Sequence, residues 1–187
     1  MGLLDVLLGR TRPVRPNLDA LFAVPAAATT LEVDLGLLPT GLGSVCFQTT
    51  EGPAAQRARD EAAGLLATDP AAGVELHTDG YGYTWMTCHG GEGDVASLVT
   101  TLHAVNTTLA DAGFGPSLLC TVIGFTGDSR RLALVYLFKR GTFYPFAPLP
   151  EHRRDTALEL QARARLAGEL PLEPDLARWF PLWDVVI

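Results

Sequence analysis

The sequence predicts one α+β domain with a mostly antiparallel sheet, and three observations support this fold class. Its 187 residues suit a single core, because domains commonly have ~100 to 200 residues. A hydrophobic fraction of 48% supplies enough apolar material for that core. The order of helix and strand patterns contains a βαββαβ section, which is typical of ferredoxin-like folds. We expect this section to carry an extra hairpin strand and terminal helices, and a secretion-chaperone-like α+β arrangement is the alternative.

The first 16 residues are predicted to form an arm, and residues 17–187 the domain. Pro13 and Pro16 must end the short apolar stretch at the N-terminus, because proline lacks the amide donor and restricts the residue before it. Two short helical pieces follow between residues 17 and 35, the second entered through Pro25. Leucines of the arm form an apolar stripe with arginines behind it. The residues of this candidate membrane contact are Leu3, Leu4, Leu7, Leu8, Arg10 and Arg12.

A strand, a helix and a hairpin are expected next. Residues 43–48 suit a strand, and residues 53–67, rich in Ala, Arg and Glu, suit a helix. Residues 74–88 contain Asp79-Gly80 between two strand-like runs, which favours a two-residue type I′ turn. That turn pairs Leu76 with Tyr83 and Val74 with Trp85 on one face of the hairpin. The opposite face then carries Glu75, His77, Thr84 and Met86.

The second half of the chain predicts two further helices around a pair of central strands. Asp94 is a suitable N-cap for a helix that ends near Gly113. Residues 117–125 and 131–138 are apolar on both alternating faces, as expected for strands covered above and below. Residues 151–168 suit a helix, and Pro174 favours a last helical turn at its N1 position.

Composition excludes several classes of partner and compartment. Lys and Arg total 14 against 21 Asp and Glu, and the net charge of -7 disfavours nucleic acid as a partner. The 3 cysteines have no CxxC spacing, which suits reduced thiols in the cytoplasm. The N-terminus lacks the pattern of a signal peptide, and no stretch approaches the ~20 apolar residues of a membrane span. We expect a cytoplasmic protein that can lie at the inner face of the cytoplasmic membrane.

No set of residues predicts catalysis, a cofactor or a metal site. The predicted hairpin register separates His77 from Cys88 along the strand and directs His89 to the other face, so these groups do not share an ion. Cys46 and Cys120 lie in apolar strands, where burial keeps thiols protonated and inert. We therefore predict no enzyme, no bound metal and no cofactor. A pocket on the face of Glu75, His77 and Met86 is the site of the rival hypothesis, an enzyme or small-ligand binder.

Two aromatic segments are candidate partner-binding surfaces, and for each the alternative is that its aromatic side chains belong to the core. In the first, prolines hold the aromatic groups of an extended segment at the end of a central strand. The second lies near the C-terminus, where aromatic side chains can anchor a partner. Periodicity does not choose between surface and core. The candidates are Lys139, Arg140, Phe143, Tyr144 and Phe146 in the first segment, and Trp179, Phe180 and Trp183 in the second.

Five runs in order give the chain a family resemblance. They are MGLLDVLLGRTRPVRPNLDALF, YGYTW, LHAVNTTLADAGFGPSLLC, LVYLFKRGTFYPFAPLP and RWFPLW. Together they resemble the PspA-associated protein PspAB family of actinobacteria, over nearly the whole chain. The resemblance implies a small cytoplasmic accessory of the phage-shock envelope-stress system, whose central protein PspA coats the inner face of the membrane. It brings no catalytic residues. The leading hypothesis is a noncatalytic adaptor that binds PspA or another envelope-stress component.

Overall fold

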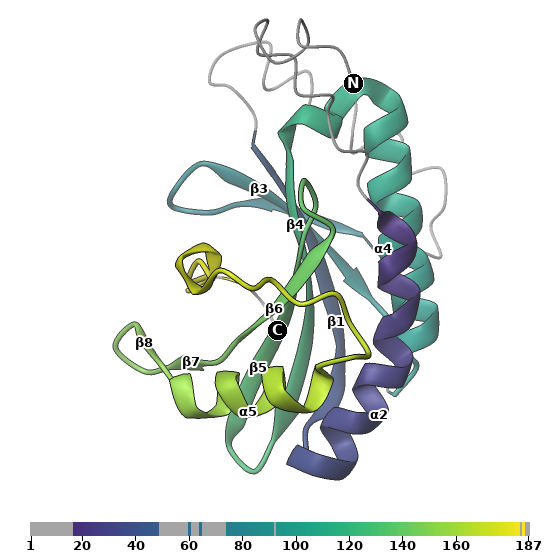
Figure 1. Cartoon of the computed structure of the whole chain (residues 1–187). Coiled ribbons are helices and arrows are strands. Elements are labelled where there is room, and N and C mark those ends of the chain that lie inside the picture. The colour runs from purple at the N-terminus through teal and green to yellow at the C-terminus, as the bar shows by residue number, and fades with distance from the viewer. Residues whose placement is uncertain are drawn as a thin grey trace, which may run out of the picture.

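The computed structural model describes residues 17–48, 60, 64, 74–91, 93–183 and 185 (Figure 1). Its helical segments are η1 (Leu18–Ala23), α2 (Val24–Leu35), α4 (Val95–Leu109), η3 (Ala110–Phe114), η4 (Gly115–Ser117), α5 (Thr156–Leu166) and η5 (Leu176–Arg178). Its strands are β1 (Leu38–Gln48), β2 (Glu75–Thr78), β3 (Tyr83–His89), β4 (Leu118–Gly127), β5 (Arg130–Leu137), β6 (Thr142–Phe146), β7 (Pro148–Leu149) and β8 (Arg153–Arg154). None of the helices described is both long and apolar enough to span a bilayer.

One six-stranded sheet has the order β2-β3-β1-β4-β5-β6, and each neighbouring pair is antiparallel. The first four strands in this order have the arrangement of a ferredoxin-like unit, and β5 and β6 extend the sheet beyond β4. The predicted α+β class with a mostly antiparallel sheet is confirmed. The helix expected over residues 53–67 lies largely outside the described residues. Within this range the structure describes residues 60 and 64, and both are helical.

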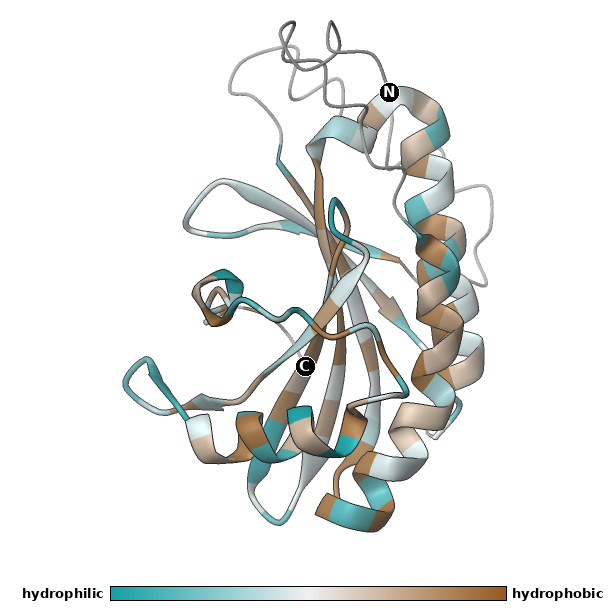
Figure 2. Cartoon of the chain, viewed as in Figure 1, coloured by the Kyte–Doolittle hydropathy of each residue, from teal (hydrophilic) through white to brown (hydrophobic). Residues whose placement is uncertain are grey.

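Helices cover one face of this sheet, called here the helix-covered face. Leu31 of α2, Leu102 of α4 and Ala162 of α5 are buried with apolar strand residues in one continuous core, called here the helix-side core. α4 approaches β1 closely at Gly43, where an added Cβ would lie 2.7 Å from Leu102 Cδ1 and 3.1 Å from the carbonyl oxygen of Val122. Figure 2 shows apolar residues along the central strands, whereas the tip of the β7–β8 hairpin is hydrophilic.

The chain passes from α5 around the β6 edge to the opposite side of the sheet, called here the second face. The Phe143 amide donates to the Pro171 carbonyl at 2.8 Å, and the Glu173 amide donates to the Phe143 carbonyl at 2.7 Å. These bonds cover an otherwise unpaired strand edge. They also direct residues 174–183, called here the C-terminal segment, onto the second face. A second core lies there, formed by Cys46, Trp85, Cys120, Val122, Ala133, Val135, Tyr144, Phe146, Trp179 and Val185.

The predicted register of the β2–β3 hairpin is wrong. Leu76 pairs with Met86 and His77 with Trp85, so the turn covers residues 79–82 in place of Asp79-Gly80 alone. The Asp79 carboxylate explains the longer turn, because its Oδ1 accepts from the amides of Tyr81 and Tyr83, each at 2.9 Å. The positive φ of 84° that this turn needs falls on Gly82. A carboxylate that satisfies two loop amides therefore outweighs the preference of Asp-Gly for the shorter turn.

Other elements differ from expectation mainly at their ends. Asp94 caps α4 as predicted, accepting from the Ser97 amide at 2.9 Å. α5 begins at Thr156, because Asp155 is its N-cap and the residues expected to open the helix form a turn and β8. η5 is capped by Asp175, so Pro174 precedes the cap and is not at N1. The extended segment expected after β5 contains β6, an edge strand that tolerates Pro145.

Candidate functional site

The first predicted partner-binding segment lies mainly inside the fold. Phe143, Tyr144 and Phe146 are 0%, 1% and 0% exposed, respectively. Phe143 faces the helix-side core, whereas Tyr144 and Phe146 belong to the second core. Of the alternatives stated above, burial therefore matches core packing for these three aromatic side chains. Lys139 is exposed in the turn between β5 and β6.

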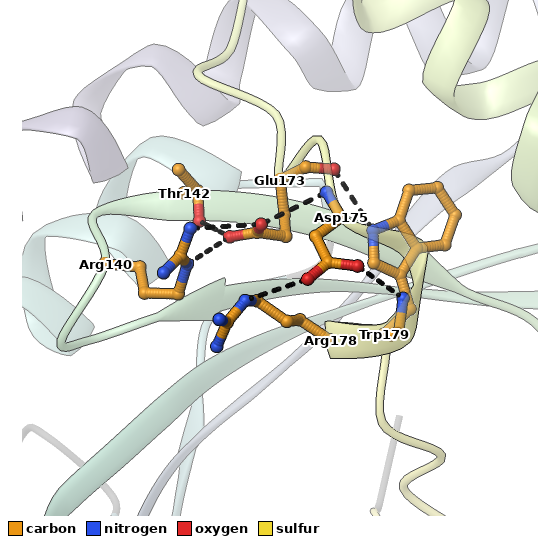
Figure 3. A network of polar contacts seen from close by, with 7 residues as sticks. Arg140, Thr142, Glu173, Asp175, Arg178 and Trp179 are labelled. Atoms are coloured by element: carbon orange, nitrogen blue, oxygen red, sulfur yellow. Dashed lines mark hydrogen bonds and ion pairs between the residues drawn. The ribbon is translucent and has the colours of Figure 1, made fainter.

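Arg140 is engaged by a buried carboxylate (Figure 3). The Glu173 side chain is 0% exposed and accepts hydrogen bonds from Nε and Nη2 of Arg140, the latter at 3.2 Å. It also accepts from Thr142 Oγ1 at 2.8 Å and from the Asp175 amide at 3.2 Å. Burial raises the pKa of Glu173, but the hydrogen bonds from Arg140, Thr142 and Asp175 and the charge of Arg140 outweigh it, so the net pKa is lowered. Glu173 is therefore a carboxylate, and in this form it holds the start of the C-terminal segment in place.

A second arginine–glutamate pair holds the same segment farther along. Glu159 of α5 is 2% exposed, and its Oε1 accepts from Arg154 Nε at 2.8 Å and from the Ala147 amide at 2.9 Å. Arg154 Nη1 donates to the Trp179 carbonyl at 2.6 Å. The guanidinium of Arg154 also lies over the Phe146 ring, 5.2 Å from its centroid. Neither buried glutamate was predicted from the sequence, because nothing in a helical or proline-rich run signals a buried carboxylate.

The second predicted segment divides between core and surface. Trp179 is 5% exposed, stacks with Tyr144 at a centroid distance of 5.9 Å, and donates from Nε1 to the Glu173 carbonyl at 3.2 Å. Phe180 is 59% exposed, and Trp183 is partly buried against Phe146. Tyr144 Oη donates to the Phe180 carbonyl at 2.9 Å, which holds the backbone while the Phe180 ring stays outside. Of the three, Phe180 is therefore the aromatic group most available to a partner.

The C-terminal segment covers a cavity of about 530 Å³ on the second face, called here the aromatic cavity. Its walls come from β1, β3, β4, β5 and β6, the β2–β3 turn and the C-terminal segment. Aromatic and aliphatic side chains predominate, and the one charged group among the described lining residues is Asp79. The lining is Cys46, Asp79, Tyr81, Tyr83, Trp85, Leu119, Cys120, Leu137, Tyr144, Phe180, Pro181, Leu182 and Trp183.

Two thiols face each other at the bottom of this cavity. Cys46 of β1 and Cys120 of β4 are direct cross-strand partners. The pKa of the Cys46 thiol is raised, mainly by its hydrogen bond with Cys120 and next by burial, so the thiol is protonated near neutral pH. The sequence placed both residues in apolar strands but did not reveal that the strands are neighbours. Cys88 lies in the helix-side core, where burial raises the pKa of its thiol to about 12.

The pocket expected on one face of Glu75, His77 and Met86 does not form, because the hairpin register differs. His77 and Trp85 share a face and their rings stack at 6.5 Å, whereas Met86 is buried in the helix-side core. His89 lies 3.7 Å from Glu75, on the face that the expected register denied it. In the described ranges, no three His, Cys, Asp or Glu side chains gather as metal ligands would.

The candidate membrane contact lies outside the described residues, as does the rest of the predicted arm. A comparison with curated proteins and one with solved structures gave no match. A family model described as PspA associated protein B matches residues 1–187, which is the whole chain. The chain therefore belongs to the PspAB family, PspA associated protein B.

Proposed function

We propose that this protein is a noncatalytic adaptor of the phage-shock envelope-stress response that binds PspA or a related membrane-stress component. The family match over residues 1–187 carries the proposal, since the family is described as PspA-associated. The architecture is compatible with such a role, because the described polar clusters hold the C-terminal segment in place. Arg140 and Arg154, for example, form ion pairs with the buried Glu173 and Glu159, respectively.

We assign the partner contact to those aromatic side chains of the candidate segments and their surroundings that remain exposed. Phe180 of the C-terminal segment and Tyr81 of the β2–β3 turn are 59% and 67% exposed and both border the aromatic cavity. Exposed aromatic groups on fixed backbone suit binding hot spots, because little conformational entropy is lost on association. Lys139 and Trp183 extend the proposed contact, whereas Tyr144, Phe146 and Trp179 of the second core support it from below.

Capture of purified PspA by the full-length protein in a pull-down assay tests the proposal. Phe180→Ser should reduce capture by about tenfold, as removal of a hot-spot aromatic does. Val33→Ser is the matched control, because Val33 is 76% exposed on α2, which packs on the helix-covered face. Equal capture by both variants would reject this contact surface, and no capture by the unmodified protein would reject PspA as the partner.

The N-terminal arm is proposed to add weak contact with the inner face of the cytoplasmic membrane. Leu3, Leu4, Leu7 and Leu8 give this short segment an apolar stripe, and its arginines suit anionic lipid. Flotation with anionic liposomes should then depend on the arm. If the full-length protein and a shortened protein that begins at Asn17 both stay in the soluble fraction, the arm does not bind membrane.

A further inference from the structure

The floor of the aromatic cavity is one row of side chains that crosses four strands. Trp85 pairs with Cys46, Cys46 with Cys120, and Cys120 with Leu137. Directly paired residues point to the same side of a sheet, so all four project toward the second face. The floor is therefore built from strands β3, β1, β4 and β5, the continuous part of the fold.

A register irregularity in the β1–β4 pairing widens this floor. Cys46 pairs with Cys120 and the next residue, Phe47, pairs with Leu118, so Leu119 is the additional residue of a bulge. Successive residues of a regular strand face opposite sides, but here both Leu119 and Cys120 line the cavity. Bulges of this kind redirect side chains and are frequent beside binding sites.

Polar contacts around the rim keep the cavity from collapsing. Asp79 accepts from two turn amides and, through Oδ2, from Trp85 Nε1 at 2.8 Å, which fixes the β2–β3 turn against the floor. On the opposite side, Tyr144 Oη holds the Phe180 carbonyl and Arg154 holds the Trp179 carbonyl. The roof and the side wall are thus attached to the sheet independently of any contact across the cavity.

Two other, more open hollows of about 500 and 440 Å³ lie beside α5, but each has an arginine in its lining, so the apolar lining and not the volume distinguishes the aromatic cavity. Protein interiors are close-packed, and side chains that line a void lose dispersion contacts. The volume of about 530 Å³ lies within the range of roughly 300 to 1,000 Å³ that is typical of small-molecule sites. At its mouth, the rings of Tyr81 and Phe180 remain largely exposed to water.

The lining specifies the chemistry of an occupant. No Lys, Arg or His is among the described lining residues, so a phosphate or carboxylate would find no opposite charge there. Asp79, the charged group present, already accepts three N–H donors. The aromatic walls favour flat rings, which stack with an offset or edge to face, and the two thiols add a polarizable surface. We propose that the aromatic cavity is a binding site for an uncharged, apolar molecule that carries an aromatic or similarly flat ring.

Fluorescence titration of the full chain with N-phenyl-1-naphthylamine, an uncharged aromatic probe, tests this site. Emission should rise and saturate with one probe per chain, with excitation outside the tryptophan band. Leu137→Trp places a large ring on the floor and should weaken binding by about tenfold or more. Leu149→Trp is the matched control, because Leu149 is 39% exposed in β7 and does not line the cavity.

The three tryptophans give a second measurement that needs no variant. Trp85 and Trp183 line the cavity and Trp179 does not, so the probe should shift the indole N–H resonances of the first two more than that of the third. Absence of saturation, equal weakening by the two Leu→Trp variants, or equal shifts of all three indoles would overturn the site. Equally tight binding of the anionic analogue 1-anilinonaphthalene-8-sulfonate would overturn the requirement for an uncharged ligand.

Discussion

Replacement of Arg140 by alanine should destabilise the fold far more than the same change at Arg178. Both arginines pair with a carboxylate in one network (Figure 3). Glu173 is 0% exposed, whereas Asp175 is 50% exposed. Loss of Arg140 leaves a buried charge without its ionic partner, which costs ~3 to 5 kcal/mol when both groups are buried. Because Arg140 itself is 41% exposed, water screens part of that interaction, and we expect about 2 to 3 kcal/mol.

Urea denaturation followed by tryptophan fluorescence measures this difference. Arg178→Ala should cost no more than about 0.5 kcal/mol, as is usual for an exposed ion pair. In a Glu173→Gln background, Arg140→Ala should cost less than it does alone, with a coupling of about 1 to 2 kcal/mol. The slope of stability against urea should be unchanged, since the surface exposed on unfolding is the same. Equal losses for the two arginine variants would refute the assignment of Glu173 as a buried charged anchor.

The lowered pKa of Glu173 also predicts a pH dependence with a definite sign. Its carboxylate is stabilised in the folded state, so the contribution is complete above the unfolded pKa of about 4.3 and is lost as the pH falls through the folded pKa. The stability advantage of the unmodified protein over Glu173→Gln should therefore be constant from about pH 7 to 6 and shrink below about pH 5. An advantage that grows on acidification would contradict the lowered pKa.

Two further predictions concern packing and the roof of the aromatic cavity. Gly43→Ala should cost about 1 to 3 kcal/mol, because the new Cβ meets Leu102 and a backbone oxygen, whereas Gly80→Ala has open space and should change stability by less than about 0.5 kcal/mol. Thermal unfolding of the two variants distinguishes these outcomes, and equal midpoints would contradict the close approach of α4. Tyr144→Phe should cost about 1 kcal/mol through loss of the bond to the Phe180 carbonyl, measured by urea denaturation. Tyr144→Ala should cost about 3 to 5 kcal/mol, and retention of full stability would show that the side chain is not core.

Much of the sheet could be predicted because its evidence is local. The apolar runs of β4 and β5 have few other stable arrangements, and the cap at Asp94 requires only the amide three residues later. The β2–β3 register was mispredicted for the complementary reason. Its turn is set by an Asp79 carboxylate that also holds Trp85 Nε1, six residues away in sequence. A rule based on two adjacent residues does not include that third partner.

The site required contacts that no local pattern contains. Cys46 and Cys120 are 74 positions apart by their numbers, and they meet because β1 lies between β3 and β4. Glu173 is buried in a proline-rich run because Arg140, 33 residues earlier, compensates its charge. In both cases the sheet order comes first and the chemistry of the side chains follows from it. An aromatic residue beside a proline can consequently be a core residue or a contact residue, and the hydrogen bonds of its backbone decide which: Tyr144 is fixed within β6, whereas the segment of Phe180 is attached by its carbonyl and leaves the ring outside.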